Sequence, residues 1–171
     1  MEINNIQIRS NNIYPEIVGA TNDPRVVMIL KDLLSSRQGE IAGVLQYFYQ
    51  SRIAKQVDEN IAEIFEEISI VEMEHAQLLM DAIVEFGGIP KYINSKNQPF
   101  TTSYLNYDLK LKDMLENNIA DEQQAIKEYT MYANMVTNPS LKALLLRIAE
   151  DEKLHLQTFK NLQNTIRFLS V

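Results

Sequence analysis

The chain has 171 residues, no cysteine and a formal net charge of −7 at pH 7. Its length is most simply that of one domain with a substantial core, and the lack of cysteine excludes disulfides and cysteine-ligated zinc or iron–sulfur centres. The acidic balance argues against a nucleic-acid partner. With no apolar run long enough for a signal peptide or a membrane span, we expect a cytoplasmic protein without a membrane partner.

Residues 1–22 show no regular pattern, and we interpret them as an N-terminal arm that precedes a domain over 23–171. Four long helices are predicted in this domain because apolar residues recur there every three or four positions. A capping residue followed by proline begins the first and the last helix, and Gly87-Gly88 ends the second. The four helices are expected at 24–57, 59–87, 109–136 and 139–168.

The connections predict how these helices are arranged. Short turns separate the first helix from the second and the third from the fourth, so each pair should form an antiparallel hairpin. The segment 88–108 has 21 residues, which at about 3.3 Å per residue can run the length of a bundle. We therefore predict an all-α fold, a four-helix bundle of two antiparallel hairpins joined by a long crossover.

Six ionisable residues interrupt the apolar faces of these helices. Each of the two histidines in the chain follows a glutamate by three positions, so each Glu-x-x-His pair shares one helix face. The first and third helices each contribute one further glutamate on the apolar face. The six residues are Glu40, Glu72, His75, Glu122, Glu152 and His155.

The spacing of the six residues indicates an internal repeat. Glu122 follows Glu40 by 82 residues, and the second Glu-x-x-His follows the first by 80. Tyr47 and Tyr129 each stand seven residues after the lone glutamate of their own hairpin. The two hairpins are therefore interpreted as copies of one unit, which would bring four carboxylates and two imidazoles together in the middle of the bundle.

Charge predicts what these residues bind. Four neighbouring buried carboxylates cannot all stay ionised without a counter-charge, and two divalent cations supply it. Oxygen and nitrogen ligands without sulfur favour iron or manganese over copper. The expected cofactor is therefore a pair of divalent ions, of iron or of manganese.

The chain resembles the ferritin-like superfamily of di-iron and di-manganese proteins over 24–168, with all six ligand positions filled. The stretches QGEIAGVLQYFYQ and VEMEHAQ are most similar to bacterioferritin, whereas the arm and the crossover look like manganese-catalase-related proteins. The resemblance implies a ferritin-like four-helix bundle and an oxidoreductase with a pair of iron ions that reacts with dioxygen or hydrogen peroxide, as a ferroxidase or a peroxide scavenger. An enzyme with a pair of manganese ions that dismutates peroxide, as a catalase does, is one alternative. A metal-storage protein without turnover is the alternative from another class.

Sequence differences from these families narrow the expected class of protein and its oligomeric state. Rubrerythrins usually carry a further glutamate at the position of Ala125, together with a cysteine-rich domain, so a self-contained rubrerythrin is disfavoured. Bacterioferritins continue into a short helix that helps build a cage, whereas 16 residues follow His155 here, so a homodimer is expected. In bacterioferritin, a methionine at the position of Met73 binds haem. We prefer a packing role for Met73 and do not expect haem.

Residues beside the six ligands should orient them. In bacterioferritin an aspartate precedes each motif glutamate, and Asp151 is therefore expected to orient His75 across the bundle. Val71 stands at the matching position for His155, so the two metal positions should be unequal. Tyr47 and Tyr129 are interpreted as core residues whose hydroxyls bond site carboxylates, with a redox role as the alternative. The expected partners are dioxygen or hydrogen peroxide and an electron donor that the sequence does not identify.

Overall fold

The computed structural model describes residues 6–169, including all side chains up to residue 166. The chain is helical, as predicted, and a single bridge between Ile93 and Pro99 is the only extended pairing within the described residues. The α-helices are α1 (Pro24–Ser35), α2 (Glu40–Ala54), α3 (Glu59–Glu85), α4 (Leu111–Met135) and α5 (Pro139–Leu169), with a short 3-10 helix, η2 (Thr102–Tyr104).

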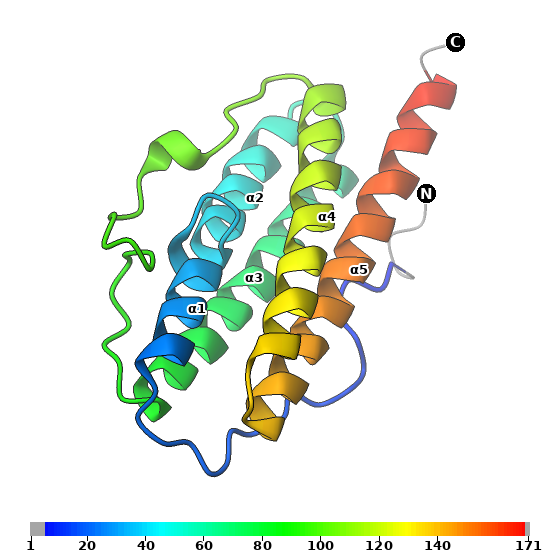
Figure 1. The fold of residues 1–171 in the computed structure, drawn as a ribbon. Coiled ribbons are helices and arrows are strands. Elements are labelled where there is room, and N and C mark those ends of the chain that lie inside the picture. Colours follow the sequence, from blue (N-terminus) through cyan, green and yellow to red (C-terminus); the bar gives the residue numbers. More distant parts are fainter. Residues whose placement is uncertain (1–5, 170–171) are drawn as a thin grey trace.

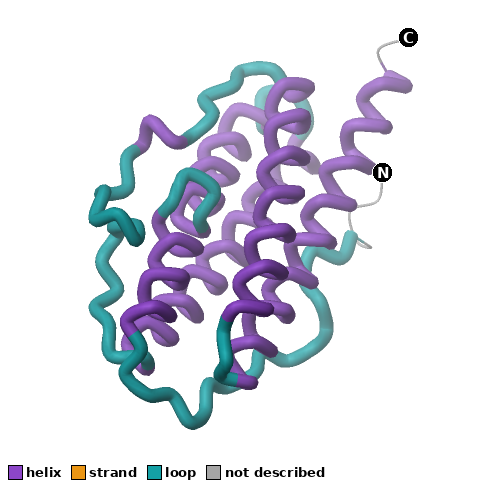
Figure 2. The backbone as a smooth tube through the Cα atoms, viewed as in Figure 1, coloured by secondary structure: helices purple, strands orange, loops and turns teal. Residues whose placement is uncertain are grey.

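The helices form a bundle of two antiparallel hairpins (Figure 1). Helices α2 and α3 make one hairpin, and α4 and α5 make the other. Helix α1 lies end to end with α2 on the same side of the bundle. The segment between α3 and α4 runs along the outside of the bundle from one end to the other, as Figure 2 also shows. The predicted crossover topology is therefore confirmed.

Local chemistry explains where these helices begin and end. The Asp23 side chain accepts hydrogen bonds from the backbone N–H groups of Arg25 and Val26, and Pro24 begins α1. Asn138 caps α5 in the same way through the N–H of Leu141, at 2.9 Å. Gly87 follows α3 with a φ of 80°, a left-handed conformation that glycine adopts at little cost.

The predicted helix over 24–57 is wrong in one respect, because it is broken into α1 and α2 between Ser35 and Glu40. Ser36 takes an extended conformation, and the chain turns back so closely that a Cβ on Gly39 would lie 2.7 Å from the Leu33 carbonyl oxygen. Apolar periodicity continues across the break and so concealed it. Glu40 is consequently the first residue of α2 rather than a residue inside a long helix.

The core is divided into two apolar clusters with a polar layer between them. One cluster includes Leu30, Leu79 and Leu145, and the other includes Phe65 and Phe159. On α3 and on α5, the Glu-x-x-His motif lies between the residues that contribute to the two clusters. The apolar clusters on both sides hold the polar layer in a water-poor environment.

The described part of the N-terminal arm, residues 6–22, has no helix or strand but is packed against the bundle. It runs beside α5 and then across one end of the bundle to α1 (Figure 1). Tyr14 and Ile17 contact the first cluster, and Ile6 and Ile8 contact the second. The arm therefore spans the level at which the polar layer lies.

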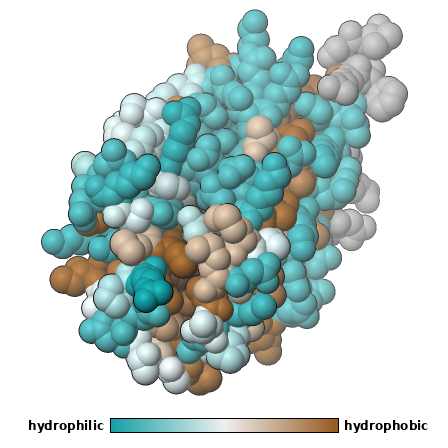
Figure 3. Space-filling model, viewed as in Figure 1, coloured by the Kyte–Doolittle hydropathy of each residue, from teal (hydrophilic) through white to brown (hydrophobic). Residues whose placement is uncertain are grey.

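The outer surface carries both hydrophilic and apolar side chains. Figure 3 shows a face on which hydrophilic side chains surround smaller apolar patches. Among the described residues, no helix combines the length and the apolar character that crossing a membrane requires.

Candidate metal centre

The bundle brings all six sequence-predicted residues together in the polar layer. Helix α2 supplies Glu40, and α3 supplies Glu72 and His75. Helix α4 supplies Glu122, and α5 supplies Glu152 and His155. Each residue is at most 5% exposed. The set is Glu40, Glu72, His75, Glu122, Glu152 and His155.

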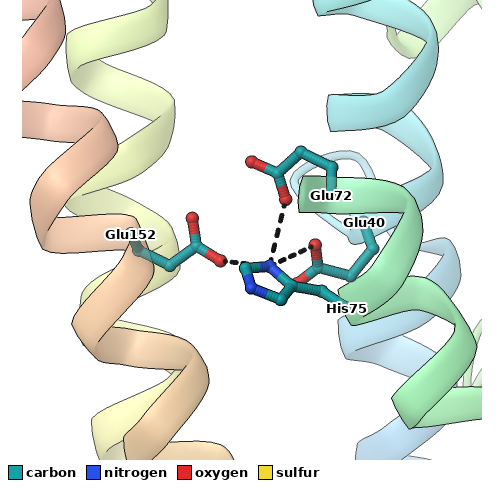
Figure 4. A group of neighbouring side chains, drawn as sticks. All are labelled: Glu40, Glu72, His75 and Glu152. Carbon is teal, nitrogen blue, oxygen red and sulfur yellow. Dashed lines mark ion pairs between the residues drawn. The ribbon is translucent and has the colours of Figure 1, made fainter. Parts of the chain in front are cut away.

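The six side chains form two overlapping groups with the spacing of metal ligands. Site A is Glu40, Glu72, His75 and Glu152, and site B is Glu72, Glu122, Glu152 and His155. Within each group, one ligand atom from every residue lies within 4.8 Å of the others. Figure 4 shows site A, where the carboxylates of three helices point at the His75 ring.

Two glutamates belong to both groups, and each directs one oxygen to either site. Glu72 places Oε2 3.5 Å from His75 Nδ1 and Oε1 3.2 Å from His155 Nδ1. Glu152 places Oε1 3.1 Å from His75 Nδ1 and Oε2 3.1 Å from His155 Nδ1. These carboxylates have the geometry of bridges between two cations, whereas Glu40 and Glu122 are confined to one site each.

Unsatisfied atoms inside site A show that a cation fits there. Three atoms are buried without a hydrogen-bond partner among the described residues: Glu40 Oε2, His75 Nδ1 and Glu152 Oε1. His75 Nδ1 lies within 3.1–3.5 Å of both oxygens, but the directions do not meet those of a hydrogen bond. Buried polar atoms are costly when unpaired, and a cation between these three atoms satisfies all of them.

Without cations, the carboxylates and imidazoles share protons unevenly. Burial, followed by repulsion from neighbouring carboxylates, raises the pKa of Glu40 and of Glu122 well above the ordinary value. Glu72 is equally buried, but its contacts with the His155 and His75 rings lower its pKa. Burial acts to lower the pKa of His155, yet its hydrogen bond with Glu152 and its contact with Glu72 raise it to about 9. The metal-free centre therefore carries protons that cations must displace.

These shifted pKa values predict how pH affects the stability of the metal-free protein. Glu40, Glu122 and His155 have raised pKa values, so the stability that they contribute is complete below their unfolded-state values and is lost as pH rises. Glu72 and Glu152, with lowered pKa values, lose their contribution only in acid. We expect the free energy of unfolding of chelator-treated protein to fall between pH 6.5 and 9. The fall should be about 1.4 kcal/mol per pH unit for each proton that the folded state holds and the unfolded state has lost.

Thermal unfolding at a series of pH values checks this. Metal-loaded protein is the control, because its ligands have already given up these protons and its stability should change much less over the same range. A metal-free protein whose stability is flat or rises between pH 6.5 and 9 contradicts the assignment.

Two tyrosines tie the lone glutamates across the bundle. Tyr47 on α2 donates a hydrogen bond of 2.6 Å to Glu122 on α4, and Tyr129 on α4 donates one to Glu40 on α2. The predicted bonds from these hydroxyls to site carboxylates are confirmed. The crossed arrangement also has the twofold relation that the sequence repeat predicted, since each hairpin orients a carboxylate of the other.

The two histidines differ in their outer partners, as predicted from Asp151 and Val71. His75 Nε2 lies 3.1 Å from Asp151 Oδ2, whereas His155 Nε2 is buried without a hydrogen-bond partner in the described part of the chain. A carboxylate only accepts hydrogen bonds, so Nε2 of His75 carries the proton, and the lone pair of a neutral ring lies on Nδ1, facing site A. The two sites are therefore unequal in how firmly their imidazole is held.

A small cavity leads to the carboxylates through the break between α1 and α2. It has a volume of about 30 Å³, and its lining includes exposed Arg37 and Gln38 at one end and buried Glu72 and Glu122 at the other. Ala125, where rubrerythrins usually carry a glutamate, also lines it. About 10–15 Å³ is enough for one water molecule, so the cavity admits molecules of a few atoms.

Other residues singled out in the sequence lie outside the two sites. Met73 is 56% exposed on α3 and is not packed between helices, so its preferred packing role is wrong for the single chain. Glu74 pairs with Arg9 of the N-terminal arm. Sequence reasoning missed Arg147, although it stands one helical turn before Asp151 at the spacing of an ion pair, and it missed Tyr14, for which no local signal exists.

Comparisons with known proteins agree with this geometry. The family model described as Rubrerythrin matches residues 31–163. A protein named as a probable manganese catalase from Clostridium acetobutylicum is 21% identical, over 85% of this chain and 73% of its own length.

Solved structures show the same fold. The manganese catalase KatB from Anabaena PCC7120 superimposes with a TM-score of 0.83 at 21% identity, over 92% of this chain and 80% of its own. The Rhodobacter capsulatus bacterioferritin, solved with a metal-free dinuclear site, gives a TM-score of 0.74 at 24% identity, over 87% and 89%. The ferritin-like four-helix bundle predicted from the sequence is therefore confirmed.

Proposed function

The chain belongs to the rubrerythrin family, and from this premise and the geometry of the centre we propose that it is a non-haem dinuclear metal oxidoreductase acting on hydrogen peroxide or dioxygen. The observation that carries the proposal is the pair of glutamates, Glu72 and Glu152, that each direct one oxygen to either histidine. All six residues of sites A and B are proposed as metal ligands. Ala125 and the absence of cysteine do not take the chain out of the family, but they separate it from the usual rubrerythrin arrangement.

Manganese is the first metal to test and peroxide the first substrate. The ligands alone suit iron as well as manganese, and the sequence led us to place iron first. Two relatives that cover most of this chain are named as manganese catalases, and this likeness supports the reverse order. An iron-loaded ferroxidase is the second candidate, supported by the likeness to bacterioferritin.

Peroxide disproportionation suits the dimensions of the centre. Two molecules of hydrogen peroxide give two of water and one of dioxygen, so one peroxide is oxidised, the other is reduced, and no separate electron donor is needed. A bound metal pair supplies the reversible electron storage that this exchange requires. The cavity of about 30 Å³ has room for a two-oxygen molecule and excludes larger organic substrates.

The chain's own residues fix and shield the reacting position. Tyr47 and Tyr129 hold the outer carboxylates by their hydroxyl groups. Asp151 holds the His75 ring through Nε2. The apolar clusters above and below exclude bulk water, which strengthens every electrostatic interaction inside the centre. Arg37 at the outer end of the cavity is the only guanidinium that lines it among the described residues.

Metal analysis and oxygen evolution test the function. We expect protein purified without added metal to contain two ions per chain, chiefly manganese, and to release one dioxygen for every two peroxides consumed. Reloading chelated protein with Mn²⁺ should restore the activity, while Fe²⁺ should not. Absorbance of an oxidised iron centre after Fe²⁺ and oxygen, without dioxygen release from peroxide, supports the ferroxidase instead. Protein that binds neither metal in a ratio near two contradicts both candidates.

Further properties belong to the same proposal. We propose a cytoplasmic homodimer with a domain at 23–171 and an arm at 1–22. Exposed apolar side chains on α2 and α4, including Phe48 and Met135, are surfaces that a second copy would cover. The net charge of −7 supports the absence of a nucleic-acid partner.

A further inference from the structure

Asp151 is buried among four hydrogen-bond or ion-pair donors. Its Oδ1 accepts a hydrogen bond of 2.6 Å from the backbone N–H of Ser10 and lies 2.7 Å from Arg147 Nη1. Its Oδ2 accepts a hydrogen bond of 2.6 Å from the Tyr14 hydroxyl and faces His75 Nε2 at 3.1 Å. The carboxylate is fully buried and has no room to turn without breaking several of these contacts.

Two of these donors come from the N-terminal arm, about 140 residues away in the chain. We call residues 9–14 the strap. Arg147 on α5 also binds the strap. Its Nε donates a hydrogen bond of 2.6 Å to the Asn12 carbonyl, and its Nη2 donates one of 2.9 Å to the Ser10 carbonyl. Its guanidinium also stacks on the Tyr14 ring, 4.3 Å from the ring centroid. The strap and α5 are therefore joined around Asp151 by buried polar contacts.

Tyr14 contacts both members of the Asp151–His75 pair. Its hydroxyl bonds Asp151, and its ring meets the His75 ring edge to face with a centroid distance of 6.0 Å. A second cation, Arg9, lies over the Tyr14 ring, 5.2 Å from its centroid, and pairs with Glu74 on α3. The tyrosine is thus held by two guanidinium groups beside the Asp151–His75 pair.

We propose that the strap is part of the metal centre, in which Tyr14 and Arg147 are positioning residues that act on site A through Asp151 and His75. The strap fixes the carboxylate, the carboxylate accepts the His75 Nε2 proton, and Nδ1 is left facing Glu40, Glu72 and Glu152. Partners of this kind set the orientation and basicity of a ligating imidazole, and their loss typically costs 10- to 100-fold in metal affinity. This inference rests on the proposed metal-binding function.

Site B lacks such support within residues 6–169. Val71 stands where an aspartate would have to be to reach His155, and His155 Nε2 has no hydrogen-bond partner among these residues. Releasing the strap should therefore lower the metal affinity of site A and leave the metal affinity of site B unchanged. A general loss of folding would weaken both.

Tyr14→Phe is the test, because it keeps the ring and its stacking and removes only the hydroxyl. We expect calorimetric titration of chelated protein with Mn²⁺ to show two sites in the wild type, and the variant to bind about 10-fold more weakly at one of them. The other site should stay within about twofold. Tyr132→Phe, on a half-buried tyrosine of α4 outside both sites, is the matched control and should change neither affinity.

A second readout does not depend on metal. The chain has only two histidines, so nitrogen-15 labelling of histidine gives two imidazole spectra that can be assigned with a His155→Gln variant. Tyr14→Phe should shift the Nε2 signal of His75 and leave that of His155 in place.

The outcomes separate the two ideas. Wild-type protein that binds a pair of neither Mn²⁺ nor Fe²⁺ ions refutes the proposed function, while an unshifted His75 signal refutes the role of the strap. Equal weakening of both sites in Tyr14→Phe, or no weakening with an unshifted His75 signal, also overturns the role of the strap. Selective weakening of one site together with a shift confined to His75 establishes it.

Discussion

Replacing Glu72 with glutamine is expected to reduce bound metal from two ions per chain to one or fewer. Glu72 directs a different oxygen to each site, and glutamine offers one oxygen and one NH₂ group, whose hydrogens repel a cation. The activity should fall by more than about 100-fold, because groups that only support a ligand already cost 10- to 100-fold when removed. Metal analysis after dialysis and the initial rate of oxygen evolution measure the two effects.

Glu67→Gln is the matched control for this variant. It makes the same chemical change five residues earlier on α3, on an exposed side chain. Two ions and full activity should remain in the control. A Glu72→Gln protein that keeps two tightly bound ions contradicts the bridging assignment of Glu72.

Glu122→Gln should change stability and function in opposite directions. Burial and then repulsion from Glu152 and Glu72 raise the pKa of Glu122, so the metal-free protein holds this residue in its protonated form. A glutamine keeps the acceptor for Tyr47 and a donor for Glu152 without that proton. We expect the metal-free variant to gain on the order of 1–3 kcal/mol at pH 8, a rise of several degrees in Tm.

The same variant should lose metal at site B and most of its activity, because glutamine cannot neutralise a cation. Differential scanning calorimetry of chelated protein, paired with metal analysis, tests both signs in one preparation. Glu116→Gln, on an exposed position of α4, is the control and should move Tm by less than about one degree. A metal-free Glu122→Gln protein that is less stable than the wild type shows that repulsion does not dominate the centre.

Much of the centre could be predicted because its residues break a regular pattern. A glutamate on the apolar face of a helix is expensive, so four of them and two histidines at repeated spacing stand out. The fold followed from the same periodicity. The break before Glu40 was missed because apolar residues keep their spacing on both sides of it, and the turn depends on how closely Gly39 approaches the end of α1.

Other features depend on contacts between distant residues. Asp151 could be expected beside His75 from motif position alone, yet the donors that hold it from the strap lie about 140 residues earlier in the chain. Tyr14 has no periodic or capping role that would mark it. Nor does spacing show that Glu72 and Glu152 divide their oxygens between the two sites, because this follows from the facing of α3 and α5.

The strap also bears on the order in which the molecule is made. Residues 9–14 are translated well before their partners Arg147 and Asp151, which belong to α5. The strap therefore has no docking surface until almost every helix exists, and it is a contact of very high sequence separation that forms late. Because the strap closes over a helix that is translated after it, its hold on Asp151 and His75 is expected only in a chain whose bundle has assembled.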